Sequence, residues 1–384
     1  MLKIETYDFW TGNESENYFQ PAISVTTDPD QLIMTLQTFN GIGDTYGPVE
    51  YAHSNDAGKS WSTPMPIPSL EHRNVNSRII EGISDVRPFF HVATNTLLVI
   101  GCNSFYGVKG NLCNGQGEAV EQYRQLPVYA IRDADGNWSE RGELSHPFFA
   151  KCNNWRVACT QIVMLPNGKL LIPIYYLLDS SDGCYSSCTL LANYDGRTIT
   201  VETVGAPIES TAGRGILEPS VTNFAGKFYL TLRAEDGCGY IAKSNNGLDW
   251  EPHTPWCWDS GEQLLMSTTQ QHWLTLGDKL YLFYTRKTTE NQDVVRWRAP
   301  IFMAEVDPTK GCLIEATEQV VLPLRRKAGI PYLLGNFHVN NLTPVRALIS
   351  DAPIWYKVTK GATPADDYIS EYESMVTVAE VKLQ

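Results

Sequence analysis

The chain has 384 residues, of which 43% are hydrophobic and 19% charged, and its formal net charge at pH 7 is −13. This composition excludes an intrinsically disordered, collagen-like or coiled-coil protein. The negative charge and the absence of a run of lysines and arginines argue against nucleic acid or an anionic membrane as a partner.

The chain carries no obvious targeting or membrane segment. No run of about 18 apolar residues predicts a membrane-spanning helix. The first residues, Met1 to Glu5, lack the apolar core of a signal peptide. The localisation stays open, with the cytoplasm favoured slightly and an exported, already trimmed chain as the alternative.

Short apolar segments flanking a tight polar turn recur along the whole chain. They lie at residues 27–34, 94–100, 165–172, 224–230 and 276–282. Each is typical of a β-hairpin, and they recur at intervals of roughly 50 to 75 residues, the range expected for propeller blades. The sequence therefore predicts an all-β fold: a six-bladed β-propeller of four-stranded blades, forming one domain over residues 1–384.

Two further segments complete the predicted ring. A degenerate sixth hairpin is expected within residues 335–351. An unclosed ring would leave exposed sheet edges, so a strand near the N-terminus is expected to pair with residues 375–381.

A second repeated motif supports the same architecture. Residues 54–61 read Ser-x-Asp-x-Gly-x-x-Trp, and residues 244–250 are a shorter version with Asn for Asp. The Asp carboxylate can accept hydrogen bonds from turn amides, the Gly suits a positive φ, and the Trp can pack against the blade. With these Asp-box (BNR-repeat) turns, the sequence resembles the sialidase (neuraminidase) superfamily of six-bladed propellers, and the resemblance covers nearly the whole chain.

Polar residues gather at one end of the predicted hairpins, opposite the turns. The first strand of a hairpin starts where the second strand finishes, so residues from several blades should meet around the axis at this end. Any one of them could be a solvated strand end, but together they favour a pocket. The set includes Arg87, Arg156, Glu218, Arg233, Gln271 and His272.

The resemblance assigns roles to four residues. Glu218 and Arg233, followed by the 244–250 turn, match the order of a family Glu that polarises a tyrosine nucleophile and a family Arg that binds the substrate carboxylate. Arg298 lies where the third family arginine is expected. Asp44 lies where sialidases keep an acid/base aspartate, although an Asp on a glycine-rich loop can also be a simple turn former.

Two positions depart from the family pattern. Phe19 stands where the first family arginine is expected, and residues 335–341 contain no tyrosine in register with the nucleophile. A neutral His272 or His338 could act as general acid or base in place of the tyrosine, the alternative being a hydrogen-bonded structural imidazole.

Taken together, these patterns predict an exo-acting, sialidase-like glycoside hydrolase. Its partner would be an oligosaccharide or glycoconjugate carrying a terminal, acidic sugar. Two alternatives stay open: a uronate lyase on the same fold, with His272 assisting, and a carbohydrate-binding propeller without catalysis. No cofactor or metal is expected, because the nine cysteines have no zinc-site spacing.

Overall fold

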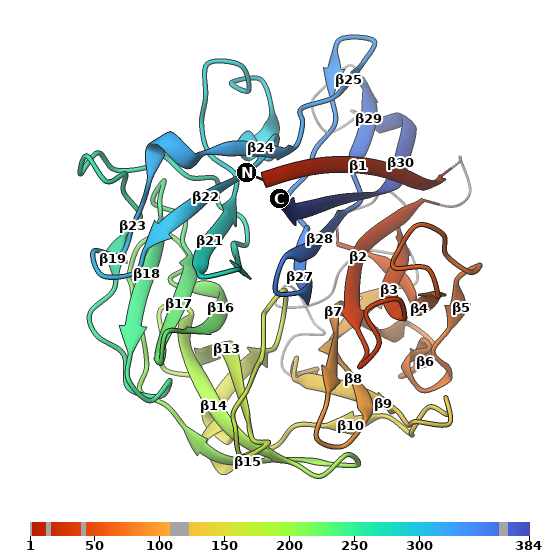
Figure 1. Cartoon of the computed structure of the whole chain (residues 1–384). Helices are drawn as coiled ribbons and strands as arrows, with labels where there is room; N and C mark the ends of the chain where they lie inside the picture. Colours follow the sequence, from red (N-terminus) through yellow and green to blue (C-terminus); the bar gives the residue numbers. More distant parts are fainter. Residues whose placement is uncertain (1, 13–16, 40–43, 108–122, 361–367) are drawn as a thin grey trace.

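The computed structural model describes residues 2–12, 17–39, 44–107, 123–360 and 368–384. Six antiparallel sheets of four or five strands surround one central axis (Figure 1). Helical structure within these ranges is limited to four short 3-10 turns, and no helix is long and apolar enough to cross a membrane. The prediction of an all-β, six-bladed propeller is confirmed.

The first three blades follow one another along the chain. Blade 1 contains β2 (Tyr18–Val25), β3 (Leu32–Phe39), β4 (Tyr46–Ser54) and β5 (Met65–Pro66). Blade 2 contains β6 (Arg73–Asn74), β7 (Ile79–His91), β8 (Thr96–Gly107), β9 (Pro127–Arg132) and β10 (Gly142–Glu143). Blade 3 contains β11 (Cys152–Arg156), β12 (Val163–Met164), β13 (Leu170–Leu178), β14 (Ser186–Tyr194) and β15 (Ile199–Val204).

The second half repeats the arrangement. Blade 4 contains β16 (Leu217–Phe224), β17 (Lys227–Arg233), β18 (Gly239–Ser244) and β19 (Thr254–Pro255). Blade 5 contains β20 (His272–Leu276), β21 (Lys279–Tyr284), β22 (Ile301–Asp307), β23 (Cys312–Leu313) and β24 (Gln319–Leu322). Blade 6 contains β27 (His338–Thr343), β28 (Arg346–Asp351), β29 (Ile354–Thr359), β30 (Tyr368–Leu383) and β1 (Leu2–Thr11). A small ribbon of β25 (Arg326–Lys327) and β26 (Ile330–Pro331) precedes blade 6.

Apolar residues on neighbouring blades pack face to face. Leu98 and Ile100 of β8 share one buried cluster with Leu170 and Ile172 of β13. The middle strands read as nearly continuous apolar runs because both of their faces are covered by adjacent blades. Each blade therefore depends on its neighbours for burial of its faces.

The two ends of the chain meet in blade 6. β1 pairs antiparallel with β30, with Leu2 opposite Leu383 and Thr11 opposite Met375. β30 also pairs with β28, so the first and last strands of the chain lie in one sheet (Figure 1). This pairing fastens the N-terminal strand to the last blade of the ring.

The turn at residues 54–61 follows β4 and is built around one carboxylate. Asp56 Oδ1 accepts hydrogen bonds from Ser54 Oγ at 2.8 Å and from the Ser60 amide at 2.9 Å, and Asp56 Oδ2 accepts from Ser60 Oγ at 2.6 Å. The bonds from Ser60, joined by that from Ser54, lower the pKa of Asp56 to about 2. Trp61 packs against the apolar cluster of blades 1 and 6.

Candidate functional site

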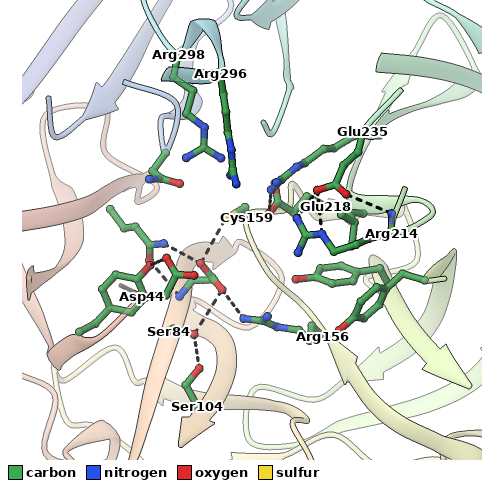
Figure 2. Close-up of a pocket in the computed structure, with 18 residues that line it drawn as sticks. Asp44, Ser84, Ser104, Arg156, Cys159, Arg214, Glu218, Glu235, Arg296 and Arg298 are labelled. Atoms are coloured by element: carbon green, nitrogen blue, oxygen red, sulfur yellow. Dashed lines mark hydrogen bonds and ion pairs between the residues drawn. The ribbon is translucent and has the colours of Figure 1, made fainter. Parts of the chain in front are cut away.

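A polar cavity of about 310 Å³ lies around the axis, at the blade end opposite the hairpin turns. Figure 2 shows the side chains that line it. All six blades contribute residues to its lining. Five of the nine residues proposed from the sequence line this cavity: Asp44, Arg156, Glu218, Arg233 and Arg298.

Three of the lining residues owe their position to the same backbone irregularity. Gln20 on β2, Asp85 on β7 and Glu218 on β16 have φ values of 50°, 57° and 43°. Each lies where the pairing with the next strand shifts register. A bulge of this kind bends the strand and re-aims a side chain, at an energetic cost that functional sites often carry. The bulges bring three polar side chains to the cavity from blades 1, 2 and 4.

Glu218 and Arg233 form an ion pair at the cavity wall. Arg233 Nη1 lies 2.5 Å from Glu218 Oε1, and Arg233 Nε donates to Thr268 Oγ1 at 3.1 Å. Burial raises the pKa of Glu218, but the positive charges of Arg233, Arg298 and Arg156 outweigh it, and the net pKa is lowered. Glu218 is therefore a carboxylate at neutral pH.

Asp85 was not proposed from the sequence, and it is held in the cavity by residues of two other blades. It accepts hydrogen bonds from Gln20 Nε2 at 2.7 Å and from Arg156 Nη2 at 2.8 Å. Burial raises the pKa of Asp85, and Glu218 adds to this effect, while Arg156 opposes it. The only sequence signal was its position two residues before Arg87.

Five arginines line the cavity, and they fall into two groups. Arg156, Arg233 and Arg214 each form an ion pair with a lining carboxylate, the last with Glu235 at 2.6 Å. Arg296 and Arg298 form no ion pair with any carboxylate in the part of the chain that the structure describes. These two guanidinium groups are available for an anionic ligand.

The two unpaired arginines lie side by side on one short turn and point into the cavity (Figure 2). Arg296 and Trp297 both have positive φ, 54° and 52°, within the 3-10 turn η3 (Val295–Trp297). Burial lowers the pKa of Arg298, and the nearby positive charges of Arg233 and Arg296 lower it further. Crowding like charges on a strained turn is costly, so an anion bound between them would stabilise this arrangement.

Asp44 lies at the mouth of the cavity, on the connection from β3 to β4. It is exposed, and its carboxylate accepts a hydrogen bond from Tyr46 Oη at 3.2 Å. Figure 2 shows it facing the cavity across from the arginine pair. An exposed carboxylate in this position can exchange protons with solvent and still reach a bound ligand.

Four residues proposed from the sequence do not line this cavity: Arg87, Gln271, His272 and His338. Arg87 hydrogen-bonds His338 Nδ1 and donates to Val339 O at 3.0 Å, and His272 Nδ1 lies 3.3 Å from Ser220 Oγ. The exposed fractions of His272 and His338 are 0% and 1%. The expectation that the two histidines lie close together holds, because their ring centroids are 5.5 Å apart, but both rings are buried, His338 against Arg87 of blade 2 and His272 against Ser220 of blade 4.

The physical reason for this difference is the register of the inner strands. His272 and His338 are the first residues of β20 and β27, and successive side chains on a strand point to opposite faces. Burial lowers the pKa of His272, assisted by the charge of Arg87, so this imidazole is neutral. Gln271 likewise accepts a hydrogen bond from Thr231 in the interior.

Asn336 is the residue of the segment 335–341, where the resemblance expects a tyrosine nucleophile, that lines the cavity, and the tyrosines that line it are Tyr46, Tyr175 and Tyr185 of other segments. Tyr332, the nearest tyrosine in sequence, instead donates to Glu373 Oε1 at 2.6 Å away from the cavity. Phe19, which stands where the resemblance expects an arginine, stacks on Tyr46 and Phe39, with both centroid distances 5.1 Å. Both departures from the family pattern are therefore visible in the structure.

The lining gives no indication of a metal centre. Among the described residues, no group of three or more His, Cys, Asp or Glu side chains is arranged to hold a metal ion. The carboxylates Asp85, Glu218 and Glu235 are each paired with an arginine.

The fold is shared with solved structures at low sequence identity. A protein of unknown function from Dyadobacter fermentans matches with a TM-score of 0.64 and 15% identity, over 100% of this chain and 99% of that one. The Hadza microbial sialidase matches with a TM-score of 0.61 and 15% identity, over 96% of this chain and 66% of its own.

Trypanosoma rangeli sialidase, which has been solved in complex with sialic acid, is also similar. It matches with a TM-score of 0.61 and 14% identity, over 95% of this chain and 55% of its own length, so this chain spans about half of that protein. No protein-family model and no curated protein matches the sequence. The six sheets, their common axis and these structural matches together identify the chain as a sialidase-like six-bladed β-propeller.

Proposed function

We propose that the protein is an exo-acting glycoside hydrolase that releases a terminal acidic sugar from an oligosaccharide or glycoconjugate. The observation that carries the proposal is the pair Arg296 and Arg298, which lack a carboxylate partner among the described residues and face Asp44 across a polar cavity. A cavity of about 310 Å³ on the axis suits a small ligand, which favours a terminal sugar over the interior of a long chain.

The arginines supply recognition of the anionic group. A planar guanidinium matches a carboxylate through two parallel hydrogen bonds. Arg298 and Arg296 bind the sugar carboxylate, and Arg233 is held beside them by Glu218 and Thr268. In this arrangement Arg296 replaces the arginine that the family pattern expects at the position of Phe19.

The carboxylates supply the chemistry. Asp44 donates its proton to the glycosidic oxygen, and the bond from that oxygen to the anomeric carbon breaks. Asp85 accepts a proton from water, whose oxygen forms the new bond to the anomeric carbon. Its burial, which raises the pKa, makes it a better base than an ordinary aspartate. Ionised Glu218 stabilises the positive charge that develops on the sugar ring.

The alternative of β-elimination on a uronate loses its proposed base, because His272 lies outside the cavity. A binding protein without catalysis would need neither an exposed acid at the cavity mouth nor a second, half-buried carboxylate with a raised pKa.

The test uses methyl and dinitrophenyl glycosides of sialic acid, glucuronic acid and glucose, with wild type and Asp44→Ala. We expect turnover of at least one acidic glycoside and none of glucose. Asp44→Ala should lose far more activity on a poor leaving group, such as methanol, than on dinitrophenol, because only the poor one needs a proton. Affinity for the acidic sugars without turnover of any of them would reject the proposal in favour of a binding protein.

A further inference from the structure

A second cavity, of about 190 Å³, adjoins the polar cavity between blades 1 and 6. Unlike the first, it is lined mainly by aromatic and aliphatic side chains, and we call it the apolar cavity. Its lining includes Phe19, Phe39, Leu334, Ile354, Tyr356 and Tyr372.

The two cavities share a border. Asp44, Arg298 and Asn336 line both of them. The shared residues include the proposed catalytic acid and one of the two unpaired arginines. A ligand that binds at these residues in the polar cavity can therefore extend directly into the apolar cavity.

A row of aromatic rings runs from one cavity to the other. Tyr46 lines the polar cavity and stacks on Phe19 with an angle of 11° between the rings. Phe19 stacks in turn on Phe39, and Phe39 contacts Tyr372 at a centroid distance of 5.4 Å. The side chain that stands in place of the expected arginine is thus part of an apolar wall.

We propose that the apolar cavity binds the leaving group of the substrate, and that this group is aromatic or alkyl. The inference rests on the proposed function. Asp44 must reach the glycosidic oxygen, which joins the sugar to the leaving group. With the sugar in the polar cavity, the group on the other side of that oxygen lies across Asp44, in the apolar cavity.

The size of the apolar cavity fits one aromatic ring. An apolar cavity of about 150 Å³ accommodates benzene in other proteins. The hydroxyl of Tyr372 is buried and forms no hydrogen bond with any described residue, so it can donate to an oxygen carried by the ring. A second sugar residue would place many hydroxyl groups against apolar walls and lose their hydrogen bonds to water.

The loop that separates the cavities is held by a buried acid. Asp351 accepts hydrogen bonds from the amides of Gly335 at 2.9 Å and Ala352 at 2.7 Å. These bonds fix the backbone next to Asn336, one of the three residues shared by the two cavities. The border between the cavities is thus built on hydrogen-bonded backbone, which favours a preformed site.

The test compares matched thioglycosides that the enzyme cannot readily hydrolyse, S-methyl and S-benzyl, each of sialic acid and of glucuronic acid. Their dissociation constants are measured by calorimetry for wild type, Ile354→Asn, which makes the apolar cavity polar, and Ile354→Trp, which fills it. Val320→Asn on β24 is the matched control, because Val320 is 46% exposed and does not line this cavity. Melting curves establish that each variant is folded.

For the sugar that binds, wild type should prefer S-benzyl over S-methyl by about tenfold or more, since burial of a ring removes apolar surface from water. Both Ile354 variants should bring this ratio close to one, and Val320→Asn should keep it. Equal affinities in wild type, or a ratio that survives both Ile354 variants, would overturn the inference while leaving the proposed hydrolase in place.

A different result identifies failure of the proposed function. If neither sugar binds in any form, benzyl alcohol alone is titrated and followed by ligand-observed NMR. Binding of benzyl alcohol that Ile354→Trp abolishes would show an apolar site unconnected with an acidic glycoside, and the leaving-group assignment would be rejected. Absence of benzyl alcohol binding would reject the apolar site itself.

Discussion

The two ends of the blades satisfy their polar groups in opposite ways. At the turn end, the hydrogen bonds of Asp56 come from Ser54 and Ser60, which are at most four residues away. At the cavity end, the hydrogen bonds of Asp85 on β7 come from Gln20 on blade 1 and Arg156 on blade 3. The first arrangement needs one turn, whereas the second needs three blades in register.

This difference teaches where charge is concentrated. Three bulged residues with positive φ and three ion pairs meet around the polar cavity, whereas the 54–61 turn, in which Ala57 also has a positive φ of 62°, is held by local hydrogen bonds. Substitutions at the cavity end should therefore change activity more than stability, and substitutions at the turn end should do the reverse.

The largest expected effect is on the proposed base. Asp85→Asn should lower kcat by about 10²- to 10⁴-fold, because the amide cannot accept the proton of the attacking water. Steady-state kinetics and the anomeric configuration of the first product, read by NMR, provide the check. Inversion is expected for direct attack by water. Retention of configuration would point to a covalent intermediate and contradict the role given to Asp85.

A smaller effect is expected at the arginine pair. Arg298→Lys keeps the charge but loses the planar fork, so it should weaken binding of an acidic sugar by roughly 1–3 kcal/mol, the scale of a charge-assisted hydrogen bond. A neutral analogue of the same sugar should lose much less. Arg296→Lys should show the same bias, and unchanged preference in both variants would remove the pair from substrate recognition.

A loss of stability is expected at the turn end. Asp56→Ala should lower the free energy of unfolding by on the order of 1–2 kcal/mol through lost turn hydrogen bonds. KM should barely change, because Asp56 does not line the cavity. A loss of turnover without a change in melting temperature would contradict the structural role.

The pH dependence of stability tests the same structural role of Asp56. The pKa of Asp56 is lowered from an ordinary 3.8 to about 2, so its stabilisation is present above pH 3.8 and is lost as the pH falls through about 2. Wild type should therefore lose more stability than Asp56→Ala between these pH values. Denaturant titrations at several pH values measure this difference.

The smallest effect is expected from glycine substitutions that relieve a positive φ, one at each end of the blades. Ala225 has φ 49° in the exposed turn between β16 and β17, and Gln20 has φ 50° at the cavity. Glycine relieves a positive φ, so Ala225→Gly should stabilise the fold by about 0.5 kcal/mol and leave kcat unchanged. Gln20→Gly relieves the same strain but removes the hydrogen bond to Asp85, and its kcat should fall.

Much of the fold could be predicted from the sequence, because each hairpin carries its own local signal. In three of the predicted hairpins, the first apolar residue after the turn is Leu32, Leu170 or Leu280. These residues lie at the start of β3, at the start of β13 and within β21. The degenerate hairpin expected within residues 335–351 is β27 and β28. That residues 1–384 form one domain stays a prediction.

The site could be predicted only in part. Glu218 and Arg233 could be predicted because they flank one hairpin, and its strands β16 and β17 pair directly. Asp85 and Arg296 were missed, and His272 and His338 were expected to face the ligand. For Asp85 and the two histidines the deciding factor was which face of the strand a residue occupies, and one bulge or one residue of register exchanges the two faces. Arg296 lies on the 3-10 turn η3, outside any strand, so no strand periodicity predicts its direction.

The sequence by itself determined the repeated hairpins, the polar turns and the concentration of charged residues at one end of the blades, because periodicity, turn chemistry and strand direction are local properties. The tertiary structure decided which of those charges neutralise one another and which remain for a ligand. Arg156 pairs with Asp85 across two blades, and Arg233 pairs with Glu218 within one. Arg296 and Arg298 are left without an ion pair in the described chain because no carboxylate comes within ion-pair distance of their guanidinium groups.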